Sequence, residues 1–362
     1  MKLLVNAPIN ALSFGNVSVN ILRELFKKNI DLIFFPIGDK AEMDAYDKIE
    51  PDFVKYLQAA TNDRYSKISK DIPSLKLWHI FGSETRYSKN QSLFTFHEVS
   101  EVTNIEKNLL SLQDRIFVSS NYTKNIFNLN GLDNVTHVPL GFDNDFQITN
   151  KTYLQDKIHF GILGKFENRK NTARIIKSWL KLFGNKPEYQ LSCAITNPFL
   201  DKARFQNELL KVLEGKQYNN LNFVPYMQTN SEVNDYLNSI DIDLGGLSGA
   251  EGWNLPSFNA TALGKWSVVI NATAHKDWAT KDNSILIEPS SLKDCYDDVF
   301  FKKGQSFNQG QFFDISDQEM DDAILKSLSY AKIPNPEGLK LQKQFTYEKT
   351  VETILCAISS QM

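Results

Sequence analysis

Glu251-Gly252-Trp253-Asn254-Leu255-Pro256 follows a run of small residues at 245–250 and precedes an apolar stretch that ends at Leu263. This order predicts a strand end, a glycine-rich turn and a helix, with a carboxylate placed in the turn. Ligands of open α/β sheets bind beyond the carboxyl ends of the strands, where N–H groups at a helix start face outward. An ordinary strand-to-helix turn, in which Glu251 only gains from the helix dipole, fits this segment equally well by itself.

A second turn of the same kind lies upstream and favours the functional interpretation. Residues 161–171 read Gly-Ile-Leu-Gly-Lys-Phe-Glu-Asn-Arg-Lys-Asn, after an apolar run and before a helical pattern. This turn carries Lys165 and Lys170 where the other carries Glu251. The two turns together predict one site, in which cationic and acidic groups converge on a single ligand between the halves of the molecule.

The composition indicates a globular protein of two domains. The chain has 362 residues, of which 42% are hydrophobic and 23% are charged, and this length suits two cores of ordinary size. The formal net charge of -3 provides no whole-molecule attraction to nucleic acid or to an anionic membrane. Nucleic acid is therefore disfavoured as a partner, although a local basic patch would still allow it.

The cysteines and the apolar runs predict a cytoplasmic protein. Cys193, Cys295 and Cys356 are widely spaced and form no CxxC or Cys/His pattern, which argues against a disulfide framework and against a zinc site. The first eight residues hold too short an apolar run for a signal peptide, and no run of 18 apolar residues occurs.

Strands and helices are predicted to alternate along the whole chain. In the first half, a helix is expected from Val17 onward with Asn16 or Ser18 as its cap, and a second helix at 123–130. Strands are expected there at 2–6, 30–36, 75–81, 92–96, 115–118 and 136–139. The polar, turn-rich stretch 141–156 is expected to be the linker.

A second series of strands and helices follows the linker. Strands are expected at 158–163, 190–195, 221–224, 240–244, 267–271 and 285–288. Helices are expected at 172–183, 202–213, 232–239, 257–263, 320–331 and 340–359. The predicted α/β fold has two Rossmann-like domains, at 1–145 and 146–340, with parallel sheets facing across a cleft, and a C-terminal helix at 341–362 that packs back on the first domain.

Three motifs occur in order along this pattern. They are Val-Pro-Leu-Gly-Phe-Asp at 138–143, Gly-Lys-Phe-Glu-Asn-Arg-Lys at 164–170, and Glu-Gly-Trp-Asn-Leu-Pro-Ser-Phe-Asn at 251–259. Their order and spacing resemble those of the retaining GT-B glycosyltransferases of family 4. The resemblance implies a nucleoside-diphosphate sugar as co-substrate, no further cofactor, and transfer of its sugar to a hydroxyl group with retention of configuration.

The resemblance also assigns roles to individual residues. Lys165 and Lys170 stand where the family has an arginine and a lysine that grip the donor diphosphate, and Glu251 stands for the first of two glutamates that hold sugar and ribose. Asn259 replaces the second glutamate, which removes a charge and one acceptor. His97 resembles a first-domain histidine that contacts the donor sugar, although a histidine near a strand end is more often structural.

Charge explains why these residue types are needed. Cleavage of a sugar diphosphate builds negative charge on the leaving phosphate, so nearby cations and N–H donors stabilise the transition state selectively. The expected catalytic residues are Glu251, His97 and Lys170. The expected donor-binding residues are Gly15, Lys165, Lys170, Tyr226, Gly252, Trp253, Asn254, Leu255 and Asn259.

Two Asp-x-Asp sequences raise the alternative of a metal-dependent enzyme. Asp241 and Asp243 lie on one predicted strand, and Asp143 and Asp145 lie in the predicted linker. Capping and pairing explain carboxylates in these positions better than a metal does, so we expect no metal ion to be required.

The acceptor is not identified by the sequence. Cations and aromatic residues gather at 64–89 in the first domain, where they could form a groove for an anionic glycan or a modified base in DNA, although a solvated surface is the simpler interpretation. Two other classes of function stay open: a non-catalytic sugar- or DNA-binding protein, and a dinucleotide-dependent enzyme suggested by Gly161 and Gly164.

Overall fold

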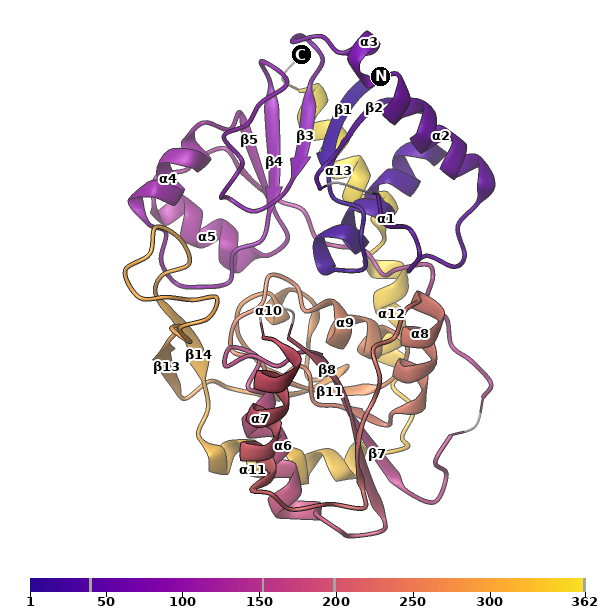
Figure 1. The fold of residues 1–362 in the computed structure, drawn as a ribbon, viewed down its shortest axis with the longest axis vertical. Coiled ribbons are helices and arrows are strands. Elements are labelled where there is room, and N and C mark those ends of the chain that lie inside the picture. The colour runs from indigo at the N-terminus through magenta and orange to yellow at the C-terminus, as the bar shows by residue number, and fades with distance from the viewer. Residues whose placement is uncertain (39–40, 152, 198–199, 361–362) are drawn as a thin grey trace.

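Two parallel sheets of six strands each organise the chain (Figure 1). The computed structural model describes residues 1–38, 41–151, 153–197 and 200–360. The first sheet has the order β2-β1-β3-β4-β5-β6. Its strands are β1 Lys2–Ala7, β2 Asp31–Pro36, β3 Ser74–Leu77, β4 Gln91–Thr95, β5 Arg115–Val118 and β6 Val135–His137.

The second sheet repeats the arrangement in the order β12-β11-β10-β7-β8-β9. Its strands are β7 Ile158–Lys165, β8 Tyr189–Thr196, β9 Leu221–Phe223, β10 Ile242–Asp243, β11 Trp266–Ile270 and β12 Ser284–Ile287. The expected two-sheet fold class is thus confirmed. Residues 138–157 run between the sheets; Thr152 within the expected linker, and residues 361–362 of the expected C-terminal segment, lie outside the described residues.

Helices cover both sheets. Those that follow strands of the first sheet are α1 Ser13–Lys27, α2 Pro51–Asn62, α3 Arg64–Lys67, α4 Asn104–Ser111 and α5 Asn121–Leu129. Those that follow strands of the second are α6 Thr172–Phe183, α7 Lys202–Leu213, α8 Asn230–Ser239, α9 Leu255–Ala262, α10 His275–Trp278 and α11 Asp317–Ser327. None of the helices in the described ranges has the length and apolar content that a membrane-spanning segment requires.

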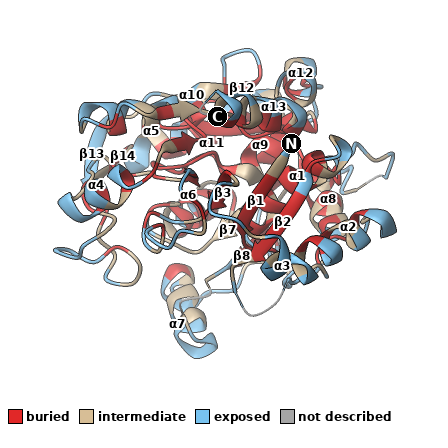
Figure 2. Cartoon of the chain, turned by 90° about the horizontal axis from the view of Figure 1, so that it is seen from above, coloured by how far each residue is buried: buried red, intermediate tan, exposed pale blue. Residues whose placement is uncertain are grey.

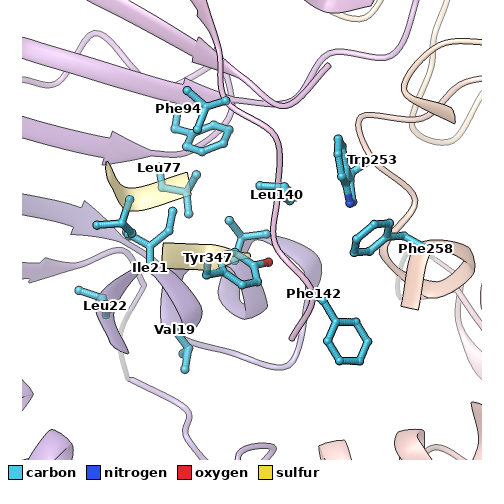
Figure 3. Close-up of a cluster of buried hydrophobic side chains, with 14 of the residues drawn as sticks. Val19, Ile21, Leu22, Leu77, Phe94, Leu140, Phe142, Trp253, Phe258 and Tyr347 are labelled. Carbon is cyan, nitrogen blue, oxygen red and sulfur yellow. The ribbon is translucent and has the colours of Figure 1, made fainter. Parts of the chain in front are cut away.

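Burial follows the apolar runs, as parallel sheets covered on both faces require. Figure 2 shows β1 and β2 of the first sheet as largely buried and the outward faces of α2, α4 and α7 as exposed. The largest apolar cluster crosses from the first domain into the second. Trp253 and Phe258 of the second domain face Leu140 and Phe142, which lie in the segment that follows the last strand of the first sheet (Figure 3).

Two expected elements of the first half differ from the structure by four residues at one end. Helix α1 begins at Ser13 rather than near Val17, because the N–H of Asn16 already bonds to the carbonyl of Leu12. Strand β3 ends at Leu77 rather than Phe81, because the chain turns there and the N–H of Ser83 bonds to Ile80.

The C-terminal segment consists of two helices, α12 Pro336–Gln344 and α13 Tyr347–Ser359, where one continuous helical segment was expected. The break lies where the segment crosses the linker: the N–H of Phe142 bonds to the carbonyl of Phe345 at 2.9 Å. A Cβ on Gly141 would lie 2.1 Å from the backbone nitrogen of Tyr347, so only glycine fits at this crossing. Helix α13 then packs on α1, beside the first sheet.

An antiparallel hairpin joins the two domains and was not expected from the sequence. Its strands are β13 Ser291–Asp294 and β14 Gln311–Asp314. The N–H of Asn308 donates to a carboxylate oxygen of Glu106 in α4 at 2.9 Å, and the N–H of Ser100 donates to the carbonyl of Gln311 at 3.1 Å. The hairpin therefore fixes the first turn of α4 against the second domain.

Candidate active site

The strands of the first sheet run toward the second domain (Figure 1), and two residues that follow them contact the turn that contains Glu251. Ser119, just after β5, donates a hydrogen bond from Oγ to the carbonyl of Gly252 at 2.5 Å. A Cβ on Gly252 would lie 3.0 Å from the Cβ of Phe96, just after β4. The glycine therefore lets the two domains approach each other next to Glu251.

The two turns that define the sequence pattern come together. Lys170 Nζ lies 2.5 Å from Glu251 Oε1, and the side chains of the two residues are 15% and 6% exposed. The cationic turn and the acidic turn thus form one cluster at the carboxyl ends of β7 and β10.

Arg169 belongs to this cluster but was not among the expected site residues. Its guanidinium lies 3.4 Å from Glu251 and 3.3 Å from Glu167, and donates to the carbonyl of Ala250. Burial opposes its charge, but the carboxylates of Glu251, Glu98 and Glu167 raise its pKa above the usual range. The sequence offered one signal for Arg169, its position directly before Lys170.

Lys165 is the third cation of the cluster. Its Nζ lies 3.5 Å from Glu167, and its side chain is 39% exposed, more than those of Arg169 and Lys170. Three cations therefore stand along one turn of seven residues, two of them buried and one reaching solvent.

Glu251 is ionised in this setting. Burial alone would raise the pKa of its carboxyl group, but Lys170 and Arg169 lower that pKa to about 2. The backbone of Glu251 is also fixed, because its N–H donates to Thr273 Oγ1 at 3.1 Å. Such a carboxylate accepts hydrogen bonds at neutral pH and does not donate a proton.

His275 supports the acidic turn, and no motif in the sequence pointed to it. Burial lowers the pKa of His275 to about 4, so the imidazole is neutral. Its Nδ1 lies 2.9 Å from the carbonyl of Ile270 and its Nε2 lies 3.0 Å from the Asn254 amide nitrogen. The proton therefore belongs on Nδ1, and Nε2 accepts from Asn254, which holds that residue in its left-handed conformation at φ 65°.

The expected donor-binding residues at the start of α9 differ in what they expose. The side chain of Trp253 is part of the core, with the residue only 2% exposed and its ring against Phe258 and Phe345. Within the described chain, the N–H groups of Gly252, Trp253 and Asn254 donate to no other group. These residues, together with Leu255 at the first position of α9, therefore offer backbone donors rather than side chains.

Asn259 lies beneath the helix surface. The residue is 5% exposed, its amide oxygen has no hydrogen-bond partner in the described structure, and its carbonyl accepts the N–H of Leu263. Its side chain therefore offers little surface to a ligand in this conformation.

His97 is buried just after β4, and its neighbour Glu98 is partly exposed. His97 is 2% exposed, its ring centroid lies 5.3 Å from that of Phe127 in α5, and its Nε2 has no hydrogen-bond partner among the described residues. The charge of Glu98 helps to raise the pKa of Arg169, and it opposes the lowering of the His79 pKa that burial causes. The carboxylate of Glu98 therefore lies close enough to the cluster to act on Arg169.

The two remaining expected residues lie after β9 and in the first turn of α1. Tyr226 follows β9 and is 56% exposed, so its ring is available to a ligand. Gly15 is buried in the first turn of α1, where a Cβ would lie 2.1 Å from the carbonyl oxygen of Asn10. This contact within its own loop is sufficient reason for a glycine there.

Both carboxylates of the first Asp-x-Asp sequence are engaged. Asp143 accepts from the Asn20 amide at 2.9 Å, and Asp145 pairs with Arg23 at 2.9 Å. Burial, reinforced by the charge of Asp145, raises the pKa of Asp143 to about 6. This pair joins the linker to α1.

The second Asp-x-Asp sequence is engaged with backbone groups. Asp241 accepts the N–H of His159 at 2.9 Å, and Asp243 accepts the N–H of Gly245 at 2.9 Å. These carboxylates order the strand ends beneath the acidic turn. In the described residues, no group of three or more His, Cys, Asp or Glu side chains is placed to hold a metal ion.

A pocket of about 240 Å³ opens beside the cationic turn. Its walls include Glu167, Arg174 at the start of α6, Arg204 in α7 and Phe300 in the hairpin loop. Arg174 is already paired with Asp314 at 2.6 Å. The pocket therefore borders the cluster through Glu167 and does not include Lys170 or Glu251.

No family model matches the chain, and no curated protein matches it in sequence. Solved structures are nevertheless similar over almost the whole chain. A sucrose-phosphate synthase from Thermosynechococcus elongatus has a TM-score of 0.69 and 11% identity, covering 100% of this chain and 98% of that one. Anabaena HepE in complex with UDP-glucose has a TM-score of 0.65 and 12% identity, covering 99% of this chain and 100% of that one.

A third structure, the α,α-trehalose 6-phosphate synthase from Burkholderia multivorans, has a TM-score of 0.66 and 9% identity, covering 99% of this chain and 96% of that one. All three share the two-sheet architecture with this chain. The chain therefore has the GT-B fold, and the sequence-based prediction of that fold is confirmed.

Proposed function

We propose that the protein is a glycosyltransferase, which moves a sugar from a nucleoside-diphosphate sugar to a hydroxyl group of an acceptor. The observation that carries the proposal is the buried cluster of Glu251 with Lys170 and Arg169, placed where the ends of the two sheets meet. The solved complex of Anabaena HepE with UDP-glucose shows that a protein of this fold holds such a donor.

The cationic turn suits the diphosphate. Lys165, Arg169 and Lys170 come from six consecutive residues, and their charges would oppose the negative charge that grows on the leaving phosphate. The unpaired N–H groups at 252–254 add donors at the start of α9, where helix geometry favours an anion. Because these groups are fixed before the donor arrives, little reorganisation is needed during the reaction.

The acidic turn suits the sugar. With its pKa lowered to about 2, Glu251 is a strong hydrogen-bond acceptor for sugar hydroxyl groups and a poor proton donor. We assign it to positioning the donor sugar. Its contacts with Lys170 and Arg169 would then couple sugar recognition to phosphate recognition, because one ion-pair cluster serves both.

The proposed reaction retains the configuration of the sugar. The acceptor oxygen would bond to the anomeric carbon on the face from which the phosphate departs, and the leaving phosphate, held by the cationic turn, would accept the proton of the acceptor hydroxyl group. This route needs no carboxylate nucleophile, and Glu251 is already committed to two cations.

A panel of nucleotide sugars tests donor binding directly. We expect one of the uridine, guanosine or adenosine diphosphate sugars to stabilise the protein by about 2.7 kcal/mol at a concentration about 100 times its Kd. The melting temperature should rise by several degrees, and the corresponding sugar-free diphosphate should stabilise less. No stabilisation by any diphosphate sugar, with stabilisation by NADH instead, would favour the dinucleotide-dependent alternative.

Metal removal tests the mechanism. The carboxylates of both Asp-x-Asp sequences are hydrogen-bonded or ion-paired, so the cationic turn is expected to carry the diphosphate alone. Release of nucleotide from the donor should therefore continue in EDTA at close to its original rate. Complete loss in EDTA, restored by Mn²⁺ or Mg²⁺, would contradict a metal-independent reaction.

A further inference from the structure

Four aromatic side chains form a surface on the first domain, which we call the aromatic shelf: Phe14, Trp78, His79 and Phe96. They come from the first turn of α1 and from the residues just after β3 and β4. The ring centroids of Phe14 and His79 are 4.5 Å apart, and those of Phe14 and Phe96 are 4.8 Å apart. His79 is exposed and the other three are partly exposed, so the cluster keeps open ring surface that a core cluster would bury.

The shelf borders the proposed donor site. Phe96 lies against Gly252, which follows Glu251 in the acidic turn. A Cβ on Gly252 would lie 3.0 Å from the Cβ of Phe96. The charge of Lys165 lies close enough to His79 to affect its titration. A molecule lying on the shelf would therefore be next to a sugar held by Glu251, which is the place of an acceptor.

Of the six cations of the first domain that the sequence suggests for an anionic acceptor, five have a partner in their own part of the domain. The six cations are Arg64, Lys67, Lys70, Lys76, Arg86 and Lys89. Lys76 is buried, with Nζ donating to the carbonyl of Gly82 at 2.6 Å, and Lys89 pairs with Asp71 at 2.8 Å. Helix α3, which holds Arg64 and Lys67, lies at the end of the first sheet remote from the second domain (Figure 1).

The charges near the shelf also disfavour an anion. Burial lowers the pKa of His79, with Glu98 acting in the opposite direction and Lys165 in the same one, so its imidazole is neutral at pH 7. The first-domain charge that acts on His79 is the carboxylate of Glu98. Lys165, across the junction, belongs to the turn that we assign to the diphosphate.

We propose that the acceptor is an uncharged glycan, whose terminal sugar ring lies on the aromatic shelf with His79 bonded to one of its hydroxyl groups. This inference rests on the proposed function and adds the class of acceptor. A sugar ring presents an apolar C–H face and a rim of hydroxyl groups, which matches apolar rings beside one neutral imidazole. An extruded nucleic-acid base would also stack, but the strand that carries it requires a cationic groove, which this surface does not provide.

The test uses the full chain and the donor identified by thermal shift, with three kinds of acceptor. Neutral saccharides are maltose, cellobiose, lactose and chitobiose; anionic ones are glucose 6-phosphate and a glucuronic acid-terminated disaccharide; the third is a single-stranded DNA oligonucleotide. We expect transfer to a neutral saccharide. Trp78→Ala should raise the KM for it by about tenfold or more, because stacking area is lost, while donor stabilisation stays unchanged.

Three further variants make the result specific. Trp78→Phe should keep most of the acceptor affinity, and His79→Gln should raise the acceptor KM without changing donor binding. Tyr65→Ala removes an aromatic side chain that is 72% exposed in α3 and should change nothing. Transfer only to anionic acceptors or DNA, transfer to none of the panel, or an unchanged acceptor KM in folded Trp78 and His79 variants would overturn the shelf. Absence of donor binding would overturn the proposed function itself.

Discussion

Glu251→Gln is expected to lower the turnover of sugar transfer by about two to three orders of magnitude, the range seen when one preorganised electrostatic contact is removed from an active site. Glutamine keeps the size of the side chain but loses the charge that orients Lys170 at 2.5 Å and Arg169 at 3.4 Å. It also replaces one acceptor oxygen by an NH2 group, which cannot accept the hydrogen bond that a sugar hydroxyl group donates in the same geometry. Initial rates of nucleotide release with saturating donor and acceptor would measure the effect.

Stability must be followed in the same variant. Removing one partner of a buried ion pair typically costs about 3–5 kcal/mol, because the other charge stays buried. Arg169 retains Glu167 and Lys170 is 15% exposed, so the loss should stay at or below that range and the protein should still fold. Glu288→Gln is the matched control, since this glutamate is exposed after β12. A folded Glu251→Gln protein with normal turnover would refute the assigned role.

The fold was predictable because local patterns and long-range packing agree. Helices α6 and α7 have the predicted bounds, 172–183 and 202–213, where apolar periodicity is strong and the flanking residues end the helices clearly. The meeting of Lys170 with Glu251 was also predictable, because carboxyl ends of neighbouring parallel strands share one edge of a sheet.

The elements that were missed depend on contacts between distant segments. Strand β13, Ser291–Asp294, is exposed along its whole length, so no apolar pattern marks it, and the hairpin loop is anchored by Glu106, about 200 residues away in sequence. The break before α13 is imposed by the linker crossing at Gly141. Neither signal can be read from a local window of sequence.

Site residues divide in the same way. Lys165, Lys170 and Glu251 stand in motifs with a recognisable turn, whereas His275 lies on a four-residue helix that no pattern marks. The orientation of a side chain near a strand end was also not predictable. His97 and Glu98 are neighbours in sequence, but their side chains interact with different groups. These groups can be identified only once the positions of α4, α5 and the cationic turn are known.

Lys170→Gln is expected to lower turnover by about a hundredfold and to weaken donor binding, since it removes a cation from the proposed diphosphate site. It should also change the titration of Glu251, because Lys170 is the strongest of the groups that lower the pKa of that carboxyl group from 4.5 to about 2. With only Arg169 close by, the pKa of Glu251 should rise, and the acid limb of the rate–pH profile should move to higher pH.

The same substitution predicts a change in pH-dependent stability. Ionised Glu251 in the wild type stabilises the fold above pH 4.5, and this contribution is lost as the pH falls toward 2, through the folded-state pKa. In Lys170→Gln, the pKa of Glu251 should differ less between the folded and unfolded states, so less free energy of unfolding should be lost as the pH falls. Urea unfolding between pH 5 and 3 would measure this loss. Lys177→Gln, an exposed position in α6, is the matched control. An unshifted acid limb in Lys170→Gln would mean that Glu251 does not govern activity through its charge, and the coupling of phosphate and sugar recognition would have to be abandoned.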